Sequence, residues 1–267
     1  MSQRIHITSM LPRSGTTLLN EMMAYAFDFN AIPEHELSVF DQLDANDGWI
    51  LTKKPHETRA SLFMLSRDPD LKLIYIDRDI RDVLCSKHGK DKKHYWTSAR
   101  TLKYQWKLRS SLLGNQRVLF IKYESLIKDT DSVEKDISNF LGGVYKKRSI
   151  SDFYKTSYYD IDTYDALGGL RPLDTKSIGV WKDHLPWIKY QLVRYPHIQS
   201  ILVELGYEKT DDWIKQLDGI NESADGLKRK GQLSKWWRMI KPKIKFFRGC
   251  VRVLLGRRRL LSGRIRP

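Results

Sequence analysis

Two hydrophobic patterns alternate along the chain: short apolar runs, and longer stretches in which apolar residues recur every three or four positions. The first pattern predicts buried strands, and the second predicts helices with one buried face. The predicted strands span residues 4–9, 49–53, 71–77 and 117–123, and the last two read as central strands. The predicted helices span residues 16–27, 80–87, 96–113, 130–141 and 197–205. This alternation is typical of an α/β fold with a central parallel sheet flanked by helices.

The same patterns divide the chain into three parts. Residues 1–217 form the predicted α/β domain, residues 218–231 a linker, and residues 232–267 a tail. Residues 151–172 have little periodicity and many Tyr, Asp and Gly residues, so we expect a long loop there that could cover a site. Residues 1–10 read as a strand rather than a signal peptide, and no apolar run of about 18 residues predicts a membrane-spanning helix.

Charge is distributed unevenly along the chain. The 267 residues include 47 basic and 32 acidic side chains, a formal net charge of +15. Residues 228–267 hold fifteen of the basic side chains and no acidic one, so the first 227 residues carry 32 of each and are formally neutral. This excludes a protein that is basic throughout, and nucleic acid is a disfavoured partner. Cys85 and Cys250 lie far apart and form no disulfide framework, which favours a cytoplasmic location.

The basic tail has the periodicity of an amphipathic helix over residues 235–255. Pro242 lies inside this pattern, and we expect it to kink or break the helix. Three partners stay open for the tail: an anionic membrane surface, to which the protein would bind peripherally, the protein's own core, and a polyanion. The recurring apolar residues are Trp236, Ile240, Ile244, Phe247, Val251 and Leu254.

The first predicted strand leads into Leu-Pro-Arg-Ser-Gly-Thr-Thr, residues 11–17, and then into a helix. A tight loop before a helix N-terminus presents backbone N–H groups and the positive end of the helix dipole to an anion. Gly15 would let a phosphate approach closely, and Thr16 and Thr17 would cap the helix and donate their hydroxyls. The segment predicts a phosphate site in a P-loop-like three-layer fold, although an ordinary strand-to-helix turn stays open.

This loop departs from the triphosphate motif GxxxxGK[ST] at two of its four fixed positions. Met10 stands where the first Gly is required, and Thr16 stands where the Lys is required. The positive charge comes instead from Arg13, within the loop. A nucleotide kinase or NTPase with a degenerate loop is therefore the first alternative function.

A second anion site is predicted where the strand 71–77 ends. Ligands of parallel sheets bind at the carboxyl ends of strands, which places Arg78 well for an anion. Ser86 follows eight residues later, about two helical turns on, and could lie on the same side. The alternative is a simple helix start, with Asp79 and Asp82 favourably placed in its first turn.

Together the two motifs resemble the sulfotransferase superfamily, in which such a loop holds the 5′-phosphosulfate of 3′-phosphoadenosine-5′-phosphosulfate (PAPS). The resemblance implies that Arg13, Ser14, Gly15, Thr16 and Thr17 bind this group, and that Arg78 and Ser86 bind the 3′-phosphate. Tyr123, in a Tyr-Glu-x-Leu segment, and Arg171, before a late Ser-Ile-Gly-Val-Trp segment, look like further nucleotide contacts. The loop is most similar to those of tyrosylprotein-type and bacterial enzymes, although the anchor and disulfides of the animal tyrosylprotein enzymes are lacking.

The resemblance also implies a reaction. The sulfonate would pass in line to a hydroxyl of a saccharide, a lipid-linked acceptor or a protein tyrosine, leaving adenosine 3′,5′-bisphosphate. Arg13 and Lys53 would stabilise the transferred group, and no metal is required. Glu34 and His56 compete for the role of general base; Glu34 is favoured over His56, because the loop is of the Arg type, and also over its neighbours His35 and Glu36. A non-catalytic membrane- or polyanion-binding protein on the same scaffold is the second alternative.

Overall fold

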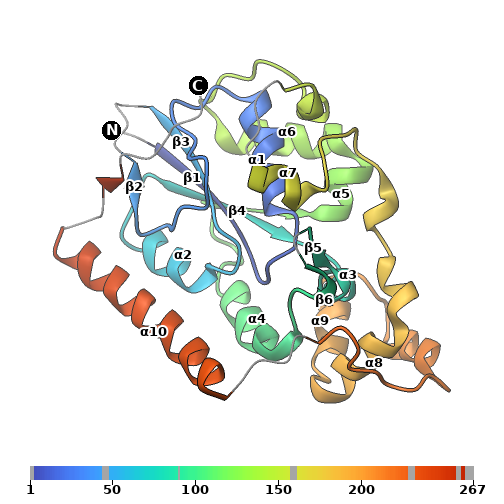
Figure 1. Cartoon of the computed structure of the whole chain (residues 1–267). Helices are drawn as coiled ribbons and strands as arrows, with labels where there is room; N and C mark the ends of the chain where they lie inside the picture. The colour runs from blue at the N-terminus through green and yellow to red at the C-terminus, as the bar shows by residue number, and fades with distance from the viewer. Residues whose placement is uncertain are drawn as a thin grey trace.

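The computed structural model describes residues 3–43, 48–89, 91–156, 161–227, 232–256 and 260–261. Its centre is a parallel sheet of four strands, all four of which were predicted (Figure 1). Their order across the sheet is β3 (Trp49–Lys53), β1 (Gln3–Ser9), β4 (Leu71–Asp77) and β7 (Val118–Lys122). The strands β1 and β4 therefore lie at the centre.

Helices cover both faces of the sheet. Alternate residues of β4 point to opposite sides: Leu73 and Tyr75 join one apolar core, and Ile74 and Ile76 join the other. The second core is closed by α1 (Thr16–Ala26), α5 (Tyr123–Lys128) and α6 (Thr130–Leu141). The first core is closed by α2 (Thr58–Leu65), α3 (Ile80–Cys85), α4 (Leu102–Ser110), α8 (Leu185–Arg194) and α9 (Ile198–Glu204). The predicted three-layer α/β fold is confirmed.

The position of β7 differs from the prediction. Residues 117–123 were expected to form a central strand, but β7 pairs only with β4 among the described residues and ends the sheet. Val118, Leu119 and Phe120 are half-buried there. An edge strand that is covered by helices on both faces has the same apolar composition as a central strand, so the pattern alone misplaced it.

The ends of most predicted helices lie close to the observed ends. The helix over 130–141 matches α6, which ends at Gly142 with a left-handed φ of 71°. The predicted helix over 96–113 is split into a 3₁₀ turn (Ala99–Thr101) and α4. The predicted helix over 80–87 ends earlier, because Ser86 is extended and leads into a hairpin of β5 (Lys87–His88) and β6 (Asp91–Tyr95).

The expected long loop over 151–172 contains two short helices, so that prediction was wrong. They are a 3₁₀ helix (Ile150–Lys155) and α7 (Ile161–Leu167), which packs against α1. Residues 157–160 of this segment lie outside the described residues. The short helix α7 escaped prediction because seven residues give too few turns for a clear period.

The tail forms one helix, α10 (Gln232–Leu254), with Pro242 inside it. The helix continues through Pro242, so the expected break does not occur, and the turns that follow pack against Phe40 and Phe63. A two-residue strand pair, β2 (Gln42–Leu43) with β8 (Leu260–Leu261), follows beyond it. Further 3₁₀ helices span Thr175–Ser177, Val180–His184 and Asp211–Leu217. Within the described ranges, no helix combines the length and the apolar character needed to cross a membrane.

Candidate active site

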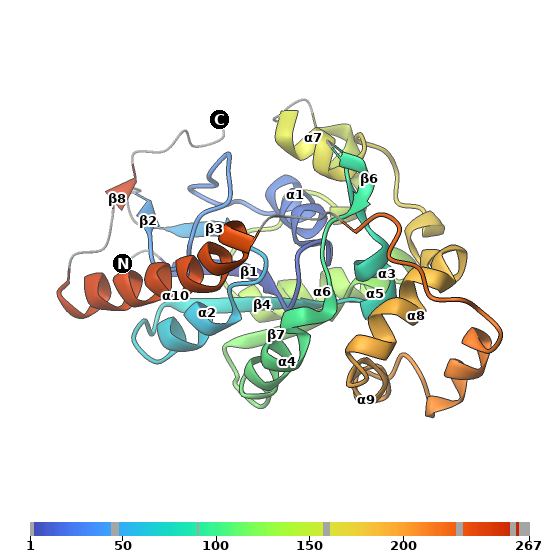
Figure 2. The same cartoon turned by 60° about the horizontal axis from the view of Figure 1, so that its bottom comes forward.

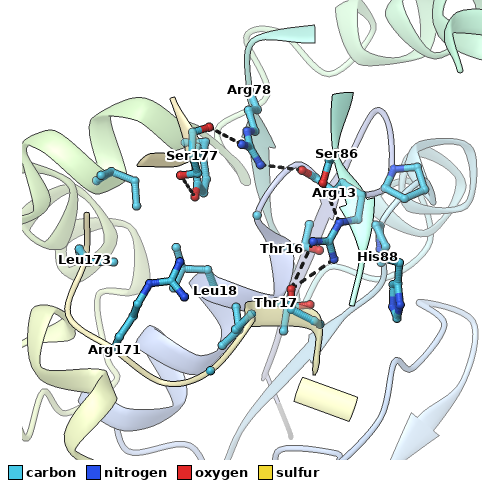
Figure 3. Close-up of a pocket in the computed structure, with 18 of the residues that line it drawn as sticks. Arg13, Thr16, Thr17, Leu18, Arg78, Ser86, His88, Arg171, Leu173 and Ser177 are labelled. Carbon is cyan, nitrogen blue, oxygen red and sulfur yellow. Dashed lines mark hydrogen bonds between the residues drawn. The ribbon is translucent and has the colours of Figure 1, made fainter. Parts of the chain in front are cut away.

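The two predicted anion motifs meet because β1 and β4 are neighbours. The strands pair from Arg4 opposite Leu71 to Ser9 opposite Ile76, so their carboxyl ends lie together. From β1 the chain crosses to β3 on one side and then to β4 on the other. Such a reversal of direction is where open α/β sheets bind ligands. A cavity of about 380 Å³ opens at this point (Figure 3).

Nearly all of the predicted donor-site residues line this cavity. The exception is Ser14, which is buried and whose Oγ donates to Leu11 O at 2.8 Å. Ser14 therefore shapes the loop from behind. The predicted residues that line the cavity are Arg13, Gly15, Thr16, Thr17, Arg78, Ser86, Tyr123 and Arg171.

Two left-handed residues give the predicted phosphate loop, residues 11–17, its shape: Arg13 has a φ of 73° and Gly15 a φ of 99°. Gly15 is the N-cap residue of α1 and offers no side chain for capping. The prediction that Thr16 or Thr17 caps this helix was therefore wrong; Thr17 Oγ1 instead accepts a hydrogen bond from Lys53 Nζ at 2.9 Å. The first N–H groups of a helix have no partners within it, so this end is suited to an anion.

Arg13 connects the loop to the second motif. Its Nε donates to Ser86 Oγ at 3.0 Å, and both terminal nitrogens donate to Ala166 O at 3.3 Å (Figure 3). Burial and the nearby Arg78 guanidinium lower the pKa of Arg13. Since the two cations repel each other, an anion bound between them would be stabilised by both.

Arg78 is buried at the end of β4 and faces the same cavity. Its two terminal nitrogens donate to Arg13 O at 2.9 Å and to Ser177 O at 2.6 Å. Its Nε is buried and has no hydrogen-bond partner among the described residues. A buried N–H without a partner costs roughly 1–3 kcal/mol. The Nε of Arg78 is therefore a charged donor that an oxygen atom of a bound ligand would satisfy.

Tyr123 holds the loop and Arg78 in place. The Arg78 guanidinium lies 4.2 Å from the centre of the Tyr123 ring, and the Tyr123 hydroxyl is 2.8 Å from Ser177 Oγ. A Cβ atom on Gly15 would stand only 2.4 Å from Tyr123 Cδ2. Glycine is therefore required here both for its φ and for the close approach of this ring.

A late segment closes the cavity, and Asp82 anchors it. Both Asp82 carboxylate oxygens accept backbone N–H groups, from Gly179 at 2.8 Å and from Trp181 at 3.0 Å. Burial, followed by the nearby Asp79 carboxylate, raises the pKa of Asp82. The sequence presented Asp82 only as a favourable first-turn residue, because nothing local indicates partners almost a hundred positions away.

Arg171 lies on the exposed rim of the cavity. Its Nε is 3.3 Å from Asp174 Oδ2, and a terminal nitrogen donates to Gly168 O at 3.0 Å. His88 and Trp96, which are stacked with centroids 4.4 Å apart, also line the cavity and were not predicted. His88 lies in β5 of the unpredicted hairpin and Trp96 directly follows β6, so only a correct end for α3 could have placed them.

The candidates for the general base are placed differently from one another. Glu34 is half-buried and does not line the cavity, whereas its neighbour Glu36 is exposed and does line it. His56 also stands outside the lining; its Nδ1 lies 2.7 Å from Met10 O, and desolvation of the ring lowers its pKa. If Nδ1 donates to that carbonyl, Nε2 is left as a proton acceptor. The choice of base stays a prediction.

Comparison with known proteins agrees with this geometry. The model of the sulfotransferase domain family matches residues 4–162, more than half of the chain. No curated protein matches the chain in sequence. Among solved structures, the sulfotransferase domain from the curacin biosynthetic pathway is similar, with 18% identity and a TM-score of 0.52 over 78% of this chain and 99% of that one.

Two further structures show weaker likeness. Mouse sulfotransferase SULT7A1 complexed with PAP (adenosine 3′,5′-bisphosphate) has 17% identity and a TM-score of 0.46, over 80% of this chain and 88% of that one. Retinol dehydratase in complex with androsterone and PAP has 17% identity and a TM-score of 0.40, over 82% of each chain. From the family match and the fold, the chain belongs to the sulfotransferase domain family and is an enzyme of the sulfotransferase class.

Proposed function

We propose that the enzyme takes its sulfonate from PAPS and releases adenosine 3′,5′-bisphosphate. The observation that carries this proposal is the pair of guanidinium groups at the ends of β1 and β4, with the buried Nε of Arg78 unpaired. A nucleotide with phosphates at both the 5′ and the 3′ position presents two anionic groups to two cationic positions. The 3′-phosphate would be bound by Arg78 and Ser86, and the 5′-phosphosulfate by the loop 13–17.

In the transfer step the protein mainly positions the acceptor and the sulfonate and stabilises the developing negative charge. The acceptor oxygen forms a bond to sulfur while the bond from sulfur to the bridging oxygen breaks, and a base takes the acceptor proton. Arg13 and Lys53 stabilise the negative charge that develops on the sulfonate and on the leaving oxygen. Lys53 is nearly buried, and its bond to Thr17 directs it toward the loop.

Three residues are candidates for the base. Glu34 and His56 are the residues that the sequence predicts, and Glu36 joins them because it lines the cavity. Replacing each by Gln in turn should identify the base as the one variant that loses about 100-fold or more in kcat while it still binds the bisphosphate. If all three variants retain near-full rates, the proposed base catalysis is wrong.

The acceptor is proposed only as a hydroxyl compound: a saccharide, a lipid-linked group or a protein tyrosine. The aromatic pair His88 and Trp96 at the cavity supports a ring-containing or apolar acceptor, since flat aromatic faces bind such groups well. A phosphate-transferring kinase is less well supported, because Arg13 replaces the lysine point charge of the triphosphate loop.

The test is transfer of labelled sulfonate from PAPS to a panel of saccharide, lipid-linked and tyrosine-containing acceptors. The expected result is transfer to one class that is abolished in Arg78→Ala. ATP turnover with Mg²⁺ in place of sulfonate transfer would support the kinase alternative. Bisphosphate binding without transfer to any acceptor would support a non-catalytic scaffold.

A further inference from the structure

The helix α10 has one face that is docked on the protein. Phe246 packs against Phe40 and Phe63, with ring centroids 5.8 Å and 6.3 Å away, and Arg59 lies 3.9 Å from its ring centre. Gly249 is buried so closely that a Cβ there would stand 2.3 Å from Phe40. Cys250 and Val253 continue this face against the core. Both views place α10 at the rim of the molecule beside α2 (Figures 1 and 2).

The apolar stripe that the sequence predicts is not this docked face. Phe247 is 68% exposed, Leu254 60%, Leu255 62% and Ile244 39%. These positions recur at helical spacing and lie on the side of α10 that faces away from Phe246 and Gly249. One of the three alternatives for the tail was docking on the core through the predicted stripe. The helix does dock, but through a different face. Among the side chains that the structure describes, the docked face comprises Phe246, Gly249, Cys250 and Val253, and the glycine weakens its apolar pattern in the sequence.

A row of cations runs beside the exposed stripe. Lys241, Lys245, Arg248 and Arg252 follow at steps of four, three and four residues, which align them along one side of the helix. The first three are exposed, and Arg252 lies 3.4 Å from Asp41. Lys243 lies on the other flank of the stripe and is also exposed. The outer surface of α10 is therefore an apolar band with cations on both sides.

We propose that this surface binds an anionic lipid bilayer, with α10 lying in the plane of the interface. The bulky apolar side chains would enter the boundary between headgroups and acyl chains, and the flanking cations would meet the lipid phosphates. A soluble polyanion would use the cations but would leave Phe247 and Leu254 in water. The band thus fits a partner with an apolar phase behind its negative charge, which a bilayer has and a polysaccharide lacks.

The face on which α10 docks is connected to the cavity lining along the chain. Phe40, on which α10 docks, is four residues from Glu36 of the cavity lining. Binding to the bilayer does not depend on the proposed donor or on any transfer reaction, so its test can fail or succeed independently of the proposed function.

The test is co-sedimentation of the full chain with vesicles of phosphatidylcholine, with and without phosphatidylserine. We expect binding to the mixed vesicles only, and a loss of about fivefold or more in Phe247→Ser. Tyr145→Ser is the matched control, because Tyr145 is an aromatic residue 71% exposed elsewhere on the surface. The double variant Lys241→Gln/Lys245→Gln should also lose binding, while Lys103→Gln/Lys107→Gln, an exposed pair at the same spacing on α4, should not.

A parallel measurement with heparin separates the bilayer from a polyanion. We expect Phe247→Ser to bind heparin as the unaltered chain does, because the change leaves the cations in place. Failure of the chain to bind mixed vesicles, or equal binding by Phe247→Ser and Tyr145→Ser, would overturn the proposal. Thermal unfolding of each variant identifies any that lose binding through loss of structure.

Discussion

The cavity at the ends of β1 and β4 and the outer surface of α10 are both cationic, but their cations are held in different ways. In the cavity, each guanidinium donates to named acceptors, and Arg78 is buried. On α10, Lys241, Lys245 and Arg248 extend into solvent beside apolar side chains. A buried, fixed donor recognises the position of an anionic group, whereas a mobile surface charge recognises only its sign.

The comparison also explains why net charge was a poor guide to the active site. The first 227 residues are formally neutral, yet they contain the whole cavity. The positive charges of the cavity are balanced by carboxylates that bind backbone N–H groups around it. Asp82 accepts from Gly179 N, and Glu124 accepts from Asp79 N at 3.0 Å. The excess positive charge belongs to the tail, none of whose described residues lines the cavity, and is better suited to binding at the protein surface.

The largest effect that would separate the two regions is expected from Arg78→Ala. Loss of its charged donors should weaken bisphosphate binding about 100-fold, because hydrogen bonds to charged groups contribute roughly 1.5–3 kcal/mol each. Vesicle binding should not change. Titration calorimetry measures the first quantity and co-sedimentation the second, with Arg194→Ala, at an exposed arginine outside the cavity lining, as the control. Equal losses in both assays would contradict the separation.

Gly15→Ala should have the next largest effect. The new Cβ would meet the Tyr123 ring at 2.4 Å, in addition to the cost of a left-handed alanine. We expect a loss of about 30-fold in bisphosphate affinity together with a lower Tm. Gly114→Ala isolates the backbone cost, because Gly114 has a φ of 76° and nothing within 4 Å of the added atom. Similar affinities for the two variants would show that the Tyr123 contact is unimportant.

Asp82→Asn should have a moderate effect. It removes the charge that accepts two backbone N–H groups of the late segment, and so loosens Ser177, which holds Arg78. We expect about a 5- to 10-fold loss of bisphosphate affinity by calorimetry. Asp131→Asn changes an equivalent first-turn carboxylate of α6 and controls for the helix dipole. An equal effect of the two changes would reduce Asp82 to the helix-start residue that the sequence suggested.

Ionic strength should produce the smallest change in the cavity and a larger one on α10. Raising salt from about 50 to 200 mM should weaken vesicle binding several-fold, because exposed charges are screened over about one Debye length. Bisphosphate binding, which relies on partly buried cations, should weaken less. A stronger salt effect on the bisphosphate than on vesicles would contradict the contrast between the two regions.

The features that could be predicted from the sequence are those that depend on residues close together in the chain. Arg13 and Arg78 each follow an apolar run, and both were predicted to bind an anion near the end of a strand. Their assignment to one nucleotide came from the resemblance to the sulfotransferases. The predicted break at Pro242 is wrong, and the contact of Phe246 with Phe40, which follows that residue in α10, could not be read from the sequence because Phe40 lies some two hundred positions away. Asp82, Ala166 and His88 were missed for the same reason: their partners are remote in sequence or lie in elements too short to have a period.

The central claim is that the cavity binds a nucleotide with phosphates at both the 3′ and the 5′ positions. Thermal unfolding with adenosine 3′,5′-bisphosphate, beside ADP, tests it most directly, because ADP lacks the 3′-phosphate. At about 100 times its Kd a ligand adds roughly 2.7 kcal/mol, which raises Tm by several degrees. We expect such a rise with the bisphosphate, little or none with ADP, and a much smaller rise in Arg78→Ala. No rise with the bisphosphate, or a larger rise with ATP and Mg²⁺, would contradict it.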